Sequence, residues 1–195
     1  DERARGDVAA AVRESSAEVE RSGTIEHRWV AYDALRAANR RDEAEQLFAE
    51  SSRIGERTDP RTLALWLATL GREPDRALAL ARRDREERQD LFSDEAYAWA
   101  LFRAGDTAEA RTVMDRTRAL EVRDPRVLYH RARVLLATGS AAEGRRALEL
   151  ALGTNPHWNA DESVEARRML HALDGAPSAA PSAPARAGSG PRAAP

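Results

Sequence analysis

The sequence contains neither cysteine nor lysine, and all 31 of its basic residues are arginine. Without cysteine, these 195 residues can supply no thiol nucleophile, no disulfide and no cysteine-ligated zinc. Without lysine, they can supply neither a Schiff-base amine nor the lysine of a phosphate-binding loop. The apolar runs are too short to cross a bilayer. Several catalytic chemistries and a membrane span are therefore excluded for this stretch of chain.

Aromatic residues are also scarce, at 5%, and about half of the hydrophobic 42% is alanine. Such a composition suits thin seams between closely packed helices, because alanine is small and has the highest helix propensity. Acidic and basic residues alternate and leave a net charge of -2, which is typical of exposed helix faces joined by ion pairs. The same balance cancels most of the attraction for phosphates. We therefore expect an all-α protein with no nucleic-acid partner.

A repeat of about 34 residues runs through the chain. Residues able to end a helix in the left-handed conformation recur at steps of 32, 34 and 34 residues: Asn39, Gly71, Gly105 and Gly139. A leucine stands four positions before each of them: Leu35, Leu67, Leu101 and Leu135. A small residue follows five or six positions after each: Ala44, Ala77, Ala110 and Gly144. This pattern predicts repeated helix–turn–helix units with the leucines buried.

The pattern also predicts where the helices lie. The first helices of the units are expected at about 24–38, 59–70, 93–104 and 125–138, and their partners at about 41–54, 74–89, 107–120 and 141–152. Pro60, Pro74 and Pro125 lie near expected helix starts, where proline is tolerated. Thr58 and Ser93 are the expected N-caps.

The stretches AGDTAEARTVM and TGSAAEGRRALELALGTNP carry the clearest form of this pattern, which resembles the tetratricopeptide repeat. The resemblance recurs in phase, in units at about 24–56, 57–90, 91–124 and 125–158. It implies a right-handed α-solenoid of stacked helix–turn–helix repeats with a C-terminal capping helix. It also implies a concave surface, lined by the first helices, that binds a segment of another protein.

Helices are expected to flank the repeats and complete a domain at 1–173. Gly6 lies 33 residues before Asn39, so the helix at 7–21 is either the second helix of an earlier pair or a simple cap. In the capping helix at 160–173, apolar residues are expected to cover the last seam while Arg167 and Arg168 face water. These apolar residues are Val164, Met169, Leu170 and Leu173. Residues 174–195, rich in Ala, Pro, Ser and Gly, are expected to be a disordered tail, serving as a linker or as a frayed end.

Positions ten, six and three before each helix-ending residue share one face of the first helices and predict the partner-binding groove. These positions, with two neighbouring ones, hold Trp29, Asp33, Arg36, Arg61, Leu65, Glu95, Trp99, Phe102, Arg103, Tyr129, His130 and Arg133. Trp, Tyr and Arg are enriched at binding hot spots, and the arginines favour an acidic peptide or a free carboxylate. In the alternative interpretation, Trp29, Trp99 and Phe102 pack inside a tightly wound array.

No catalytic motif is present, and the four histidines form no i,i+4 pair that predicts a metal site, so we expect no cofactor and histidines at the surface. The charged run at 82–90 is either a partner-binding knob or a solvated helix face.

The predicted function is non-catalytic: a scaffold or adaptor that binds another protein or peptide. The alternatives are the sensor or scaffold portion of a larger enzyme or regulator, and self-association through the N-terminal helix. The chain begins at Asp1, which leaves open a leader or an upstream domain, and with it whether the protein is cytoplasmic or exported.

Overall fold

The computed structural model describes residues 2–116 and 122–175, with side chains from residue 7 onward. This part of the chain is entirely helical and forms ten helices without a strand. They are α1 (Glu2–Arg21), α2 (Ile25–Ala37), α3 (Arg41–Thr58), α4 (Pro60–Leu70), α5 (Pro74–Arg88), α6 (Leu91–Arg103), α7 (Thr107–Arg116), α8 (Pro125–Ala137), α9 (Ala141–Thr154) and α10 (Ala160–Gly175). The predicted tail from 176 onward and the predicted end of the helix at 107–120 lie outside the described residues.

The first helices end as the repeat predicts. Asn39, Gly71, Gly105 and Gly139 have φ angles of 60°, 67°, 96° and 80°, all in the left-handed region. At each of these ends, the amide that follows the left-handed residue donates a 2.9 Å hydrogen bond to the carbonyl of the leucine five positions earlier. This is the Schellman arrangement, which satisfies backbone carbonyls that a helix end would otherwise leave free. The prediction of repeated helix ends is confirmed.

The helix starts agree with the prolines but not with the predicted caps. Pro60, Pro74 and Pro125 are each the first residue of their helix, where a missing N–H costs no hydrogen bond. The predicted cap Thr58 is wrong: it is the last residue of α3, and Asp59 accepts from the Thr62 amide instead.

Ser93 is also wrong as a cap, because it lies inside α6. Asp90 caps that helix by accepting a 2.8 Å hydrogen bond from the Ser93 amide. The Ser93 hydroxyl donates to the buried Asp84, so it ties α6 to α5.

The interior consists of seams between helices. The four repeat leucines are buried, so this prediction is confirmed, and Ala44, Ala77, Ala110 and Gly144 in the second helices are buried as well. Each helix from α1 to α10 packs against the next along the chain, and α2, α4, α6 and α8 also pack against one another in turn.

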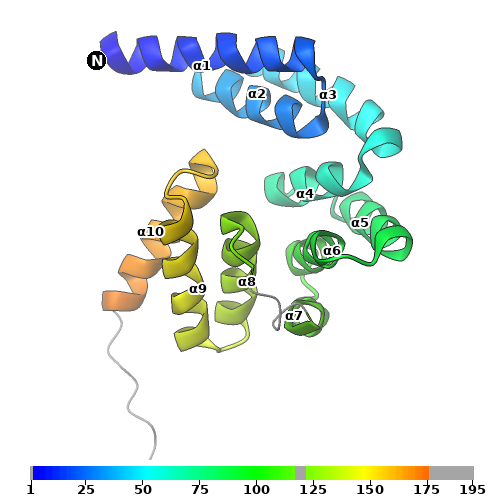
Figure 1. The fold of residues 1–195 in the computed structure, drawn as a ribbon, viewed down its shortest axis with the longest axis vertical. Helices are drawn as coiled ribbons and strands as arrows, with labels where there is room; N and C mark the ends of the chain where they lie inside the picture. Colours follow the sequence, from blue (N-terminus) through cyan, green and yellow to red (C-terminus); the bar gives the residue numbers. More distant parts are fainter. Residues whose placement is uncertain (1, 117–121, 176–195) are drawn as a thin grey trace, which may run out of the picture.

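The helices follow a curved path that brings α8 and α10 back toward α2 (Figure 1). Two contacts close this path. Arg126 at the start of α8 donates to Glu26 of α2 at 2.7 Å, and Asn159 before α10 donates to Asp33 of α2 at 3.3 Å. The helix α2 is therefore bonded directly to the start of α8 and to the residue that precedes α10.

The two flanking helices differ in detail from the expectation. α1 begins at Glu2 and runs through Gly6 without a break, so the predicted start at residue 7 is wrong while the predicted end at Arg21 is confirmed. In α10, Arg167 and Arg168 are exposed as predicted, but Val164 is 39% exposed and does not cover the last seam. The buried residues of α10 are instead Glu162, Ser163 and Ala166, with Met169, Leu170 and Leu173 half-buried beside the core.

Candidate functional site

Half of the residues predicted to line an open groove are buried inside the molecule. They are Trp29, Leu65, Glu95, Trp99, Tyr129 and His130. The expectation that these side chains face solvent is therefore wrong, and the burial of Trp29 and Trp99 agrees with the alternative of packing within a tightly wound array. The physical reason is that α2, α4, α6 and α8 pack against one another in turn, and that Glu162 of α10 bonds to His130 of α8.

Two groups of stacked rings fill this inner region. Trp29 stacks on Trp66 with centroids 5.9 Å apart, and the Arg126 guanidinium lies 4.9 Å from the centre of the Trp29 ring. Further along, the Trp99 indole stacks on the His130 imidazole at 3.8 Å and on Phe102 at 5.5 Å. The stack of Trp29 on Trp66 joins α2 to α4, and the stack of Trp99 on His130 joins α6 to α8.

An ionic chain crosses the same region from α6 through α8 to α10. His130 is fully buried, with Nδ1 bonded to Glu95 and Nε2 lying 3.1 Å from Glu162. The other Glu162 oxygen accepts a 2.9 Å hydrogen bond from the Trp158 indole. Burial alone would lower the pKa of His130, but the charges of Glu162 and Glu95 raise it. Burial would raise the pKa of Glu162, and His130 lowers it, so an imidazolium is held between carboxylates.

Sequence reasoning placed His130 beside the groove and expected histidines at the surface, which is wrong for this residue. Its partners lie 35 residues before it and 32 residues after it. These separations are close to the repeat period, so carboxylates at neighbouring repeat positions were a usable signal.

A pocket of about 190 Å³ opens on the inner side, where α2, α4, α6, α8 and α10 meet. It is lined by Trp29, Asp33, Arg36, Trp99, Arg103 and Tyr129 from the predicted set, with Thr69, Leu70, Asn159, Asp161, Glu162 and Glu165. The structure thus brings half of the predicted site together. Sequence reasoning missed the four polar residues at 159–165, because it treated α10 only as a cap.

The carboxylate at one side of this pocket is Asp33. Its only hydrogen bond to a described side chain comes from the Asn159 amide, whose oxygen also caps α10 by accepting from the Asp161 and Glu162 amides. Burial, and then the nearby charge of Asp161, raise the pKa of Asp33 to about 7.

Three arginines lie at or near this pocket: Arg103 on α6, Arg133 on α8, and Arg36 on α2, the helix that also carries Asp33. Arg103 is exposed, donates to the Thr69 carbonyl at 3.2 Å and lies 5.5 Å from the centre of the Trp99 ring. Burial of its guanidinium, and then the charge of Arg133, lower the pKa of Arg103. Arg133 is half-buried and donates to the Tyr129 hydroxyl and to Glu165, both at 2.7 Å. Among the described residues, neither Arg103 nor the exposed Arg36 forms an ion pair within 4.0 Å.

The remaining predicted residues lie elsewhere. Arg61, Leu65 and Glu95 line a second pocket of about 290 Å³, together with Arg126 and Phe92 among others. Arg61 lies over the Phe92 ring at 5.7 Å and within 3.9 Å of Asp90. Nine of the twelve predicted residues thus line one of two pockets, and the other three, Phe102, His130 and Arg133, line neither.

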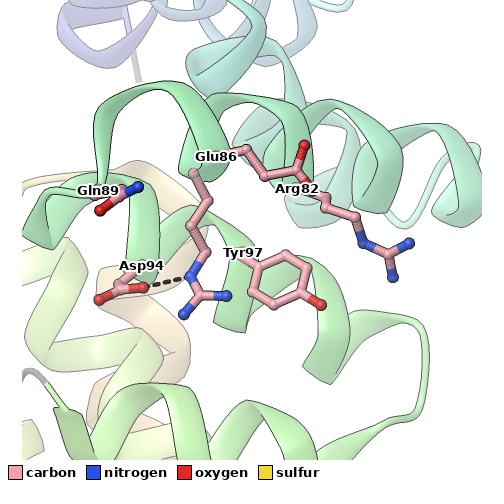
Figure 2. A pocket seen from close by; sticks show the side chains of 6 residues that line it. Arg82, Glu86, Gln89, Asp94 and Tyr97 are labelled. Carbon is pink, nitrogen blue, oxygen red and sulfur yellow. Dashed lines mark hydrogen bonds and ion pairs between the residues drawn. The ribbon is translucent and has the colours of Figure 1, made fainter.

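A third hollow, of about 490 Å³, lies between α5 and α6 and involves the charged run at 82–90 (Figure 2). Arg85 donates to Asp94 at 2.5 Å and lies 5.0 Å from the centre of the Tyr97 ring. Asp84 is buried and pairs with Arg88 at 3.1 Å. Part of the run therefore holds α5 against α6, while Arg82 remains exposed.

Within the described residues, no group of three or more His, Asp and Glu side chains is placed to hold a metal ion. No described helix combines the length and apolarity that a membrane span requires.

No protein-family model matches the chain, and a search of curated proteins gives no significant match. What the inner pocket offers chemically is recognition by charge, with arginine and carboxylate groups around a buried aromatic floor.

Proposed function

We propose that this chain is a tetratricopeptide-like, right-handed solenoid that acts without catalysis as a protein-interaction scaffold or adaptor. The proposal is supported by the repeat of about 34 residues, by the recurring left-handed helix ends and by the packing of first helices against one another. Repeat arrays of this kind commonly use an inner surface for binding.

The partner contacts the rim of the inner pocket rather than its floor. Trp29, Trp99 and Tyr129 are buried, so they support the surface but offer little area to a partner. The accessible part of the predicted site is Arg36 and Arg103, with the half-buried Phe102 and Arg133 beside them.

The observation that carries the proposal is that Arg36 and Arg103 are exposed at one pocket and lack an ion-pair partner in the described part of the chain. Arginine binds carboxylates through paired, charge-assisted hydrogen bonds. The partner is therefore an acidic segment of another protein.

Affinity capture from the source cell, followed by mass spectrometry, tests this function. We expect the double variant Arg36→Gln with Arg103→Gln to lose partners that the wild-type chain captures, while helical circular dichroism is unchanged. The matched control is Arg53→Gln with Arg82→Gln, which removes the same charge from exposed positions on α3 and α5. If the Arg36→Gln, Arg103→Gln variant recovers every partner as well as the wild-type chain does, the proposal is contradicted.

A further inference from the structure

The inner pocket holds acidic and basic groups in one small space. On the side of α2 and α10, Asp33 lies with Asp161 and Glu162, which are charges of its own sign, and with Arg36, which is of opposite sign. On the side of α6 and α8, Arg103 is influenced most, among charged groups, by Arg133, which again is of its own sign, and less by Glu165 and Glu162, which are of opposite sign. For each of the two groups, the strongest neighbouring charge is therefore of its own sign.

Neither group is neutralised by a direct ion pair in the described chain. Asp33 accepts only the Asn159 amide, at 3.3 Å, and no ion pair joins it to Arg36. The Arg103 guanidinium donates only to the Thr69 carbonyl among described groups, which leaves donors of its planar fork available. Buried charges in proteins are normally paired, so the half-buried Asp33 lacks a direct ion-pair partner, and the exposed Arg103 has donors free for one.

We propose that the pocket binds a compact zwitterion, a molecule of the free amino acid class that carries one ammonium and one carboxylate group. The ammonium lies against Asp33 and the carboxylate against Arg103. Trp29, Trp99 and Tyr129 also line this pocket, although each exposes only a small edge to it. This small-molecule site goes beyond the proposed scaffold function and does not depend on a protein partner.

The charge arrangement selects this class over simpler ligands. A cation without a carboxylate leaves Arg103 unpaired, and an anion without an ammonium adds repulsion to Asp33, Asp161 and Glu162. A zwitterion supplies both missing counter-charges. The volume of about 190 Å³ is also below the range of about 300–1,000 Å³ that drug-sized ligands occupy, so the ligand is small.

The test is a titration of the full chain with ω-amino carboxylates, from glycine to 6-aminohexanoate, followed by calorimetry and by tryptophan fluorescence. The series varies the separation of the two charges and so also measures the span of the site. Butylamine and butyrate serve as singly charged controls. A buffer of about pH 8 keeps Asp33 ionised, because its pKa is about 7.

We expect at least one member of the series to bind with one-to-one stoichiometry and about tenfold or more tightly than butylamine or butyrate. Asp33→Asn and Arg103→Gln should each weaken this binding about tenfold, because each removes one charged contact. Arg53→Gln, an exposed change on α3, should leave binding unchanged.

The inference is overturned if no member of the series binds at millimolar concentration, if a singly charged control binds as tightly as the best member, or if the two pocket variants bind like wild type. Because the wild-type titrations need no substitution, loss of folding in a variant does not decide the result. Failure here together with normal, arginine-dependent partner capture would leave the scaffold function standing. Zwitterion binding without any partner capture would support the small-molecule site and contradict the scaffold function.

Discussion

His130 is fully buried on α8, where side chains from α6 and α10 bond to its two ring nitrogens. The repeat register correctly places it beside the inner face of α8. It does not reveal that α6 and α10 bring Glu95 and Glu162 against both ring nitrogens, because the register assigns a residue to a face and says nothing about the helix opposite. For the same reason, the register does not reveal that Trp99, which was predicted for an open groove, is only 1% exposed.

Replacing His130 with Gln should lower the free energy of unfolding by about 3–5 kcal/mol, because two buried carboxylates then lose the cation between them. Urea denaturation followed by circular dichroism measures the change. His171→Gln, at an exposed position of α10, is the control and should stay within about 0.5 kcal/mol of wild type. A His130→Gln variant as stable as this control would show that the ionic chain does not form.

Asp33→Asn should stabilise the protein at alkaline pH. The folded state raises the pKa of Asp33 to about 7, so folding favours the protonated form and the ionised form costs stability. This cost is complete above about pH 7 and disappears as pH falls toward the ordinary aspartate value of about 4. We expect a gain on the order of 1–2 kcal/mol at about pH 8, after allowance for partial exposure, shrinking toward about pH 4. Thermal melts of variant and wild type across this range would show an equal difference at every pH if the carboxyl titrates normally.

At the scale of single helices, most of the fold could be predicted from local signals. Left-handed Asn39 and three glycines mark helix ends, and Pro60 and Pro125 mark helix starts. The caps were missed although a signal existed. A proline fits best as the first residue of a helix, which makes Asp59, and not Thr58, the cap of α4.

This assignment predicts different effects for two adjacent substitutions. Asp59→Ala should cost about 1 kcal/mol of stability, because the carboxylate oxygen accepts a 3.1 Å hydrogen bond from the Thr62 amide. Thr58→Ala should cost less than about 0.5 kcal/mol, since its exposed hydroxyl bonds only the Ile54 carbonyl within its own helix. Chemical denaturation of both variants decides the matter, and a larger loss in Thr58→Ala would reverse the assignment.

At the scale of the whole molecule, the decisive feature is the meeting of the first and last units across the inner side. Curvature is set by contacts between residues about one hundred positions apart, such as Arg126 with Glu26, and periodicity carries no information about them. This is why the groove residues were predicted as one exposed set, while the structure buries half of them and places Asp33, Arg36 and Arg103 at one pocket and Arg61 at another.

The contact between Arg126 and Glu26 gives the most direct test of this closed arrangement. A double-mutant cycle with Glu26→Ala, Arg126→Ala and the double variant isolates their interaction from the packing of Arg126 on Trp29. The control is the same cycle on Arg40 and Glu43, an exposed pair three residues apart. We expect a coupling energy of about 1 kcal/mol or more for Glu26 and Arg126, and less than about 0.5 kcal/mol for the control pair. Purely additive effects of Glu26→Ala and Arg126→Ala on the free energy of unfolding would contradict the closure of the inner face.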